Sequence, residues 1–231
     1  MSKTLLLTRC KEDNLILKKR LNHEGYICFE MSLLRHRYKN FDYKILDHFN
    51  DIIVTSKRAA KAIPSIINSV NNIKNAWVVG KISAAILENK GYKVKFVANS
   101  ANELVKSLPS DANSQLIYLA GNNISVEMPS FVKTVEIYKI SYKDSISETE
   151  INLLKSGLSY ILLYSENCAK TLLNLIVKND LLKYLENSVI IAISSKVAKP
   201  LAGYFKNVIA ASSAEQMIEE LEYYDRKKST E

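Results

Sequence analysis

Small and hydroxylated residues stand directly after several short apolar runs of this chain, where a strand is expected to give way to a helix. They are Thr8-Arg9, Thr55-Ser56, Val79-Gly80, Ser165-Glu166-Asn167 and Ser194-Ser195. The first N–H groups of a helix have no partner within it, and the helix dipole favours negative charge there, so such turns bind carboxylate or phosphate. Ser and Asn there also serve as simple N-caps, which contribute about 1 kcal/mol each. For any single residue we favour the N-cap, but recurrence of the pattern in both halves strengthens the anion-binding hypothesis for the set.

Motifs for other chemistry are absent. The segment GKISAA (80–85) lacks the leading Gly of a phosphate loop, and no GxGxxG or GxSxG occurs. His23, His36 and His48 have neither metal-ligand nor catalytic-triad spacing. We therefore expect no cofactor and no metal, and a function in which binding and orientation of the ligand dominate.

The chain carries a decayed internal repeat. Residues 51–63 (DIIVTSKRAAKAI) correspond to 160–172 (YILLYSENCAKTL), 77–94 to 190–208, and 99–104 to 212–217. Each pair combines an apolar strand, a turn of small residues and the start of a helix. The offset drifts from 109 to 114 residues. The sequence therefore predicts a duplicated α/β unit.

Apolar runs alternate with helical patterns along nearly the whole chain, which indicates βαβ units and parallel sheets. The strands are continuous apolar runs, as expected when helices cover both faces of a sheet. We expect an α/β fold of two similar, three-layer, flavodoxin-like lobes. A length of 231 residues accommodates two such lobes.

Two stretches, 30–40 and 136–143, alternate apolar with polar residues, which suits half-exposed strands. We interpret them as paired linker strands, at 31–40 and 135–143. One lobe (41–134) would then be inserted into the other, which combines 1–30 with 144–231. Two sequential lobes remain the alternative.

The formal net charge of +8 makes an anionic partner plausible, although the basic residues are dispersed and a merely solvated surface is the alternative. No aromatic and basic residues interleave on a strand pair, so we expect no nucleic-acid partner. A steep salt dependence of binding to random DNA would revive that reading.

Cys10, Cys28 and Cys168 are widely spaced and form no CxxC, so neither a disulfide framework nor a zinc site is indicated. A reduced, cytoplasmic location fits this pattern. No apolar stretch approaches the ~18–20 residues that span a bilayer, and the start lacks a signal-peptide core. We expect no membrane association and a monomer.

The same segments resemble the uroporphyrinogen-III synthase family. The resemblance rests on short motifs over almost the full length: LLLTR (5–9), DIIVTSKRA (51–59), VVGKISAAILENKGYKV (78–94), YLAG (118–121), EIYK (136–139), LLYSENCA (162–169) and AISSKVAKPLAGY (192–204). This chain departs from the family pattern at Cys10 (usually Pro), Arg58 (Asn), Ser83 (Thr) and Ala120 (Arg). The departures at Arg58 and Ala120 put individual substrate contacts in doubt.

The resemblance implies two α/β lobes joined by a two-stranded linker. It also implies closure of linear hydroxymethylbilane to uroporphyrinogen III, with inversion of the terminal pyrrole and loss of water. Tyr138 would be the proton donor to the leaving hydroxyl. The implied residues around the substrate carboxylates are Arg9, Ser56, Lys57, Lys81, Ser165, Asn167, Ser195 and Lys196, with Arg58 as an alternative to Lys57. The rival hypothesis is a non-catalytic, two-lobe binding protein for an anionic metabolite.

Overall fold

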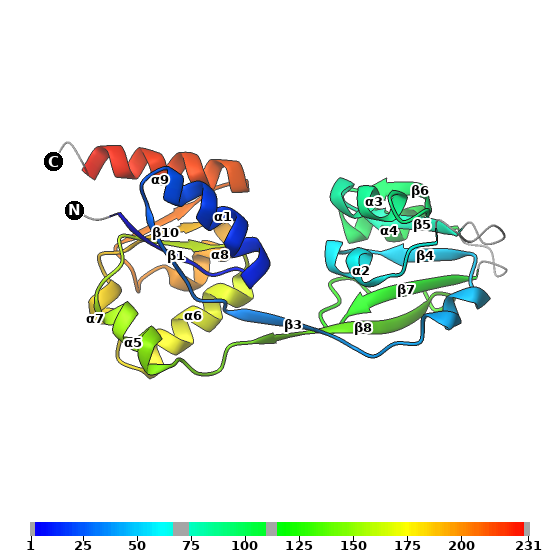
Figure 1. Cartoon of the computed structure of the whole chain (residues 1–231), viewed down its shortest axis with the longest axis horizontal. Coiled ribbons are helices and arrows are strands. Elements are labelled where there is room, and N and C mark those ends of the chain that lie inside the picture. The colour runs from blue at the N-terminus through cyan, green and yellow to red at the C-terminus, as the bar shows by residue number, and fades with distance from the viewer. Residues whose placement is uncertain (1–2, 67–73, 110–114, 229–231) are drawn as a thin grey trace. The chain divides into compact units, whose positions relative to one another are not determined.

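The computed structural model describes residues 3–66, 74–109 and 115–228 and divides the chain into two compact units. Unit 1 combines Met1–Arg35 with Ser141–Glu231, and unit 2 is His36–Ile140. The chain therefore leaves unit 1, builds unit 2 and returns to complete unit 1, as the colour sequence in Figure 1 shows. This confirms the expected α/β class with one lobe inserted into the other.

The sheet of unit 1 has five parallel strands in the order β11-β10-β9-β1-β2. Their bounds are β1 (Thr4–Leu7), β2 (Ile27–Glu30), β9 (Tyr160–Leu163), β10 (Val189–Ala192) and β11 (Asn207–Ala210). Leu5 and Leu7 of β1 pack in one apolar cluster and Leu6 in another, and all three are fully buried. Both faces of this sheet are therefore covered, which explains why its strands are continuous apolar runs.

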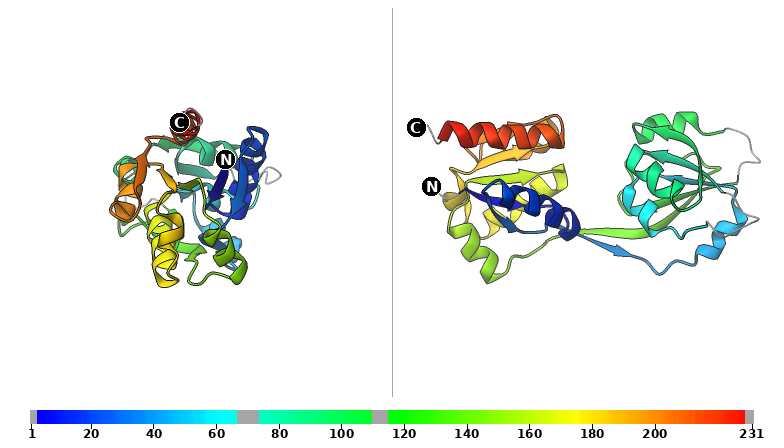
Figure 2. Two further views of the ribbon diagram at one scale, coloured as in Figure 1. Left: turned by 90° about the vertical axis from the view of Figure 1, so that its left-hand side faces the viewer. Right: turned by 45° about the horizontal axis from the view of Figure 1, so that its top comes forward.

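Helices form the outer layers of unit 1 (Figure 2). The cluster around Leu5 and Leu7 includes residues of α1 (Lys11–His23) and α9 (Ala214–Lys228). The cluster around Leu6 includes residues of α5 (Glu148–Lys155), α6 (Glu166–Lys178), α7 (Leu182–Leu185), α8 (Ser195–Ala198) and the 3-10 turn Lys199–Leu201.

The sheet of unit 2 has the order β3-β8-β7-β4-β5-β6. Its strands are β3 (Leu34–Tyr38), β4 (Asp51–Val54), β5 (Asn75–Val79), β6 (Lys93–Ala98), β7 (Leu116–Gly121) and β8 (Lys133–Tyr142). One face packs against the 3-10 helix Tyr43–His48, α2 (Lys57–Ala62) and α3 (Lys81–Glu88), and the other against α4 (Ala101–Ser107). The β4–β8 strands are parallel, so this unit repeats the architecture of unit 1.

The internal repeat of the sequence corresponds to equivalent parts of the two sheets. Its segments become β4, β5 and β6 in unit 2 and β9, β10 and β11 in unit 1, and each triplet is adjacent in its sheet. On the other side of β4 follow β7 and then β8, and on the other side of β9 follow β1 and then β2. The spatial order is therefore the same in both units, and only the point at which the chain begins each unit differs.

The chain passes between the units along β3 and β8, which are neighbours in one sheet. Lys39 N–H donates to the Ile137 carbonyl and Lys143 N–H to the Leu33 carbonyl, both at 2.9 Å, so the two strands run antiparallel. The sequence predicts one lobe at 1–30 with 144–231, the other at 41–134, and linkers at 31–40 and 135–143. These limits stay a prediction, because β8 serves both as a linker and as a strand of unit 2.

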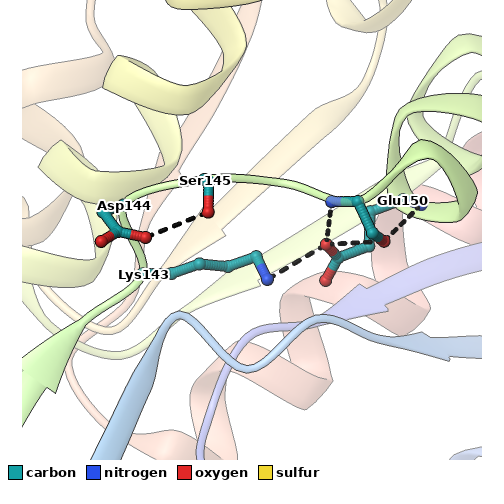
Figure 3. Close-up of polar contacts among 5 residues, drawn as sticks. Lys143, Asp144, Ser145 and Glu150 are labelled. Atoms are coloured by element: carbon teal, nitrogen blue, oxygen red, sulfur yellow. Dashed lines mark hydrogen bonds and ion pairs between the residues drawn. The ribbon is translucent and has the colours of Figure 1, made fainter.

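A capping box begins α5, where the chain re-enters unit 1. Glu150 N–H donates to Ser147 Oγ at 3.3 Å, and Ser147 N–H donates to the Glu150 carboxylate at 2.8 Å. Lys143 Nζ lies 3.0 Å from the same carboxylate, as Figure 3 shows. Burial raises the pKa of the Glu150 carboxyl, but the Ser147 hydrogen bonds and the Lys143 ammonium outweigh it and lower the pKa below its ordinary value.

We predict that Glu150→Gln destabilises the protein by about 0.5–1 kcal/mol at neutral pH, because it keeps the cap but loses the ion pair. Glu150→Ala, which loses both, should cost about 2 kcal/mol. Since the folded-state pKa is lowered, the stabilisation is present above the unfolded-state pKa and is lost as the pH falls through the folded-state value. Urea unfolding at several pH values measures this. A Gln deficit that persists undiminished at acidic pH would contradict it.

Candidate active site

Two pairs of hydroxyl groups meet in unit 2 where β4 ends. Ser56 Oγ lies 2.9 Å from Tyr138 Oη, and Thr55 Oγ1 lies 2.7 Å from Tyr118 Oη. Thr55 and Ser56 directly follow β4, whereas the phenols come from β7 and β8. Chain connections reverse direction between β4 and β7, because β5 and β6 extend the sheet on one side and β8 on the other. Such a switch point is where open α/β sheets bind ligands.

Ser56 has two roles in this arrangement. Its Oγ accepts a hydrogen bond from Ala59 N–H at 3.1 Å and so caps α2, as the N-cap reading of the sequence expected. The same oxygen contacts the phenol of Tyr138. The cap therefore fixes the orientation of a hydroxyl group that in turn holds the tyrosine.

Tyr138 is only 6 % exposed and packs edge-on against Tyr38, with 6.4 Å between the ring centroids. Burial raises the pKa of the neighbouring Tyr118, the hydrogen bond with Thr55 lowers it, and the nearby Tyr138 raises it, for a net rise. Tyr118 therefore stays a neutral phenol at physiological pH. The cluster holds polar groups in a mostly apolar setting.

Arg9 in unit 1 is held from two sides. Its guanidinium lies 2.8 Å from the Asp13 carboxylate and 4.6 Å from the centroid of the Tyr164 ring. Burial raises the pKa of Tyr164 to about 12, although the Arg9 charge lowers it. Thr8 Oγ1 donates to the Leu162 carbonyl at 2.6 Å and joins this turn to β9. The positive charge of Arg9 is thus partly neutralised by Asp13.

A fully buried Asn14 shapes the same turn. Its Oδ1 accepts from Arg9 N–H at 3.0 Å, and its Nδ2 donates to the carbonyls of Arg9 at 2.8 Å and Leu7 at 3.3 Å. One side chain thereby satisfies three backbone groups between β1 and α1. Asn14 was not among the residues predicted from the sequence, although a polar residue amid Leu15, Ile16 and Leu17 is a usable signal.

The remaining candidates of unit 1 gather around the start of α6. Ser165 caps that helix by accepting from Cys168 N–H at 3.2 Å, and Asn167 Nδ2 donates to Tyr142 Oη at 3.0 Å. Glu166 lies 2.6 Å from Lys170 Nζ and 3.2 Å from Lys196 Nζ. Lys196 is therefore ion-paired, while Ser195 is the exposed first residue of α8.

In unit 2, Lys57 and Lys81 are the first residues of α2 and α3. Gly80 caps α3 with a φ of 81°, a conformation that favours glycine. Gly80 and Lys81 help line a cavity of about 340 Å³, together with Glu88 of α3 and Asn99 after β6. The acidic Glu88 offsets part of the positive charge there. Anion binding at these helix starts stays a prediction.

Within the described ranges, no three His, Cys, Asp or Glu side chains come together as a metal site would need. Cys10, Cys28 and Cys168 are buried and form no disulfide. Burial raises the pKa of Cys28 to about 11, so its thiol is a poor nucleophile. None of the helices in the described part of the chain has the length and apolarity to cross a membrane.

Comparison with known proteins places this two-unit fold. The family described as uroporphyrinogen-III synthase HemD matches residues 16–219. Uncharacterized protein RP474 of Rickettsia prowazekii (strain Madrid E) is 30% identical, over 90% of this chain and 92% of that protein.

Two solved structures share the fold. Uroporphyrinogen-III synthetase of Helicobacter pylori 26695 has a TM-score of 0.57 and 19% identity, over 95% of this chain and 97% of that one. A mutant uroporphyrinogen III synthase of the extremely thermophilic bacterium Thermus thermophilus has a TM-score of 0.57 and 11% identity, over 98% and 100%.

The fold and the match define the class as a two-unit α/β enzyme of tetrapyrrole biosynthesis. The chain belongs to the uroporphyrinogen-III synthase family, which confirms the recognition made from its short motifs.

We predict that Asn14→Ala destabilises the protein by about 1–3 kcal/mol, because the part-buried N–H and carbonyl of Arg9 lose their partner, whereas the Leu7 carbonyl keeps its bond from Met31 N–H. Urea unfolding measures the change. Asn22→Ala, at an exposed position of the same helix, is the matched control and should stay within about 0.5 kcal/mol of wild type. Equal effects of the two substitutions would contradict the role assigned to Asn14.

Proposed function

We propose that this chain cyclises linear hydroxymethylbilane to uroporphyrinogen III, inverting the terminal pyrrole and releasing water. The observation that carries the proposal is the contact between Tyr138 Oη and Ser56 Oγ, in a chain of this family. It joins the residue proposed as proton donor to the turn proposed to bind a substrate carboxylate. Neither residue requires a metal or a cofactor for these roles.

Tyr138 acts as the general acid in this proposal. The C–O bond of the hydroxymethyl group breaks, the phenol proton goes to the leaving oxygen, and water departs. The resulting methylene-pyrrolenine cation attacks the far ring, passes through a spiro intermediate and rearranges. The proton lost from carbon at ring closure restores the phenol, so the reaction balances with one water released.

Ser56 supports the phenolate that this step creates. A hydroxyl that donates to an anionic oxygen makes a charge-assisted hydrogen bond, which is stronger than a neutral one. Because general acid catalysis supplies only part of an enzymatic rate enhancement, most of the rate must come from orienting the flexible substrate.

Charge favours unit 2 as the part that attracts the polycarboxylate substrate. Residues 36–140 contain 14 Lys and Arg against 8 Asp and Glu, a formal +6, whereas the remaining residues have 18 against 16, a formal +2. In unit 1, Arg9 and Lys196 are each within ion-pair distance of a carboxylate. We infer that backbone N–H groups and cations around Ser56, Lys57 and Lys81 bind substrate carboxylates, with Arg9, Ser165, Asn167, Ser195 and Lys196 contributing from unit 1.

The protein is proposed to act as a monomer in the cytoplasm, without nucleic acid. The first test supplies freshly generated hydroxymethylbilane to the purified chain, oxidises the product and separates the uroporphyrin isomers. We expect mainly type III, above a control without enzyme that closes spontaneously to type I. Type I alone would overturn the proposal and leave a binding protein for an anionic metabolite.

We predict that Tyr138→Phe lowers kcat about 10²-fold, the low end for the loss of a general acid, because orientation of the substrate supplies most of the rate in this proposal. Ser56→Ala should lower kcat about 10-fold, because the phenol keeps its proton but loses its hydrogen-bond partner. Tyr92→Phe, which removes another buried hydroxyl of unit 2 that donates to the Pro64 carbonyl, is the control and should leave kcat unchanged. Full activity of Tyr138→Phe would exclude Tyr138 as the acid.

A further inference from the structure

A β-bulge occurs in β8 at Tyr138. The register pairs Ala120 with Glu136 but Gly121 with Tyr138, so Ile137 is an extra residue in β8. Side chains normally alternate between the two faces of a strand. Here Ile137 and Tyr138 are consecutive, both buried, and members of the same apolar cluster. The bulge therefore turns the Tyr138 side chain to the face that carries α2 and Ser56.

Gly121 provides the space that the turned ring occupies. A Cβ added at Gly121 would lie 2.5 Å from Cε2 and Cζ of Tyr138 and 2.8 Å from its Oη. Gly121 is not among the glycines with positive φ, so its backbone conformation does not demand glycine. Its missing side chain is needed because the Tyr138 ring lies directly on the backbone of β7.

Asn122 fastens β8 just beyond the bulge. Its Oδ1 accepts from Ile140 N–H at 2.7 Å, and its Nδ2 donates to the Ile140 carbonyl at 3.0 Å. The side-chain amide thus takes the place of a backbone partner after β7 has ended at Gly121. This clamp holds β8 two residues past Tyr138, at a point where the strand has no further pairing with β7.

We propose that Gly121 and Asn122 are positioning residues that hold the hydroxyl of Tyr138 on Ser56. Gly121 accommodates the ring, and Asn122 fixes the strand that carries it. Neither residue touches the reacting atoms in this proposal. The inference rests on the proposed function of Tyr138 as the acid, and it adds two residues that were not among the site residues predicted from the sequence.

The kinetic test uses Gly121→Ala and Asn122→Ala with the hydroxymethylbilane assay. We expect Gly121→Ala to lower kcat about as much as Tyr138→Phe, with KM within about twofold of wild type, because positioning and not substrate affinity is lost. In the Tyr138→Phe background the same substitution should lower kcat no further. Asn122→Ala should lower kcat by a smaller factor, and Asn122→Asp, which keeps the acceptor for Ile140 N–H, should recover part of it.

Ala120→Gly is the matched control. Ala120 is buried in the cluster on the opposite face of the sheet, so its truncation perturbs packing beside Gly121 without touching Tyr138. It should lower the Tm and leave kcat unchanged. An equal loss of kcat in Ala120→Gly, or a loss from Gly121→Ala that persists in the Tyr138→Phe background, would overturn the proposal.

Thermal unfolding separates this inference from the proposed function. Gly121→Ala should lower the Tm of the wild-type chain and should not lower it in a Tyr138→Ala background, where the ring is absent. If Tyr138→Phe is fully active, the acid role fails, and this Tm cycle alone decides the steric claim. An equal Tm loss in both backgrounds would overturn the steric claim.

If Gly121→Ala does not fold, the kcat of Asn122→Ala decides whether the proposal holds. A kcat of Asn122→Ala equal to that of wild type would overturn it.

Discussion

Burial of parallel strands on both faces is the constraint on which the rest of this structure depends. Leu5 and Leu7 face one helical layer and Leu6 the other, so the backbone of each strand is shielded. Most of these parallel strands, such as β1, β4 and β9, are followed by a helix. The carboxyl ends of all these strands then lie at one edge of the sheet, next to helix starts. Ser56 and Ser165 stand at equivalent turns of the two units for this reason, and each caps its helix.

The proposed chemistry depends on local departures from this regular pattern. In a regular ladder, Gly121 would face Ile137 and the Tyr138 side chain would lie on the other face of β8. One extra residue in β8 and one absent side chain in β7 place the phenol beside Ser56 instead. Bulges of this kind re-aim side chains near functional sites. The proposed site uses one phenol and one hydroxyl group for the proton transfer, which suits a reaction governed mainly by substrate orientation.

The two units share an architecture but differ in electrostatics. Unit 1 balances its charges closely, and its carboxylates lie beside cations such as Arg9, Lys143 and Lys196. Unit 2 carries most of the excess positive charge of the chain. A decayed duplication can diverge in this way because the buried face of each unit, and not its surface charge, holds the fold together. One unit is then free to specialise in attracting a polyanion.

The sequence by itself determined the α/β class, the duplication, the insertion of one unit into the other and the family. These follow from apolar runs, turn residues and short motifs, all of which act locally. It also made Ser56 and Tyr138 candidates separately, through a helix start and a family motif. Only the tertiary structure decided that Ser56 contacts Tyr138 and that Thr55 contacts Tyr118. The same holds for the hydrogen bonds of Asn122 to Ile140 and for the three hydrogen bonds of Asn14. Strand register and the position of a bulge depend on pairing between segments far apart in the chain, which no local pattern encodes.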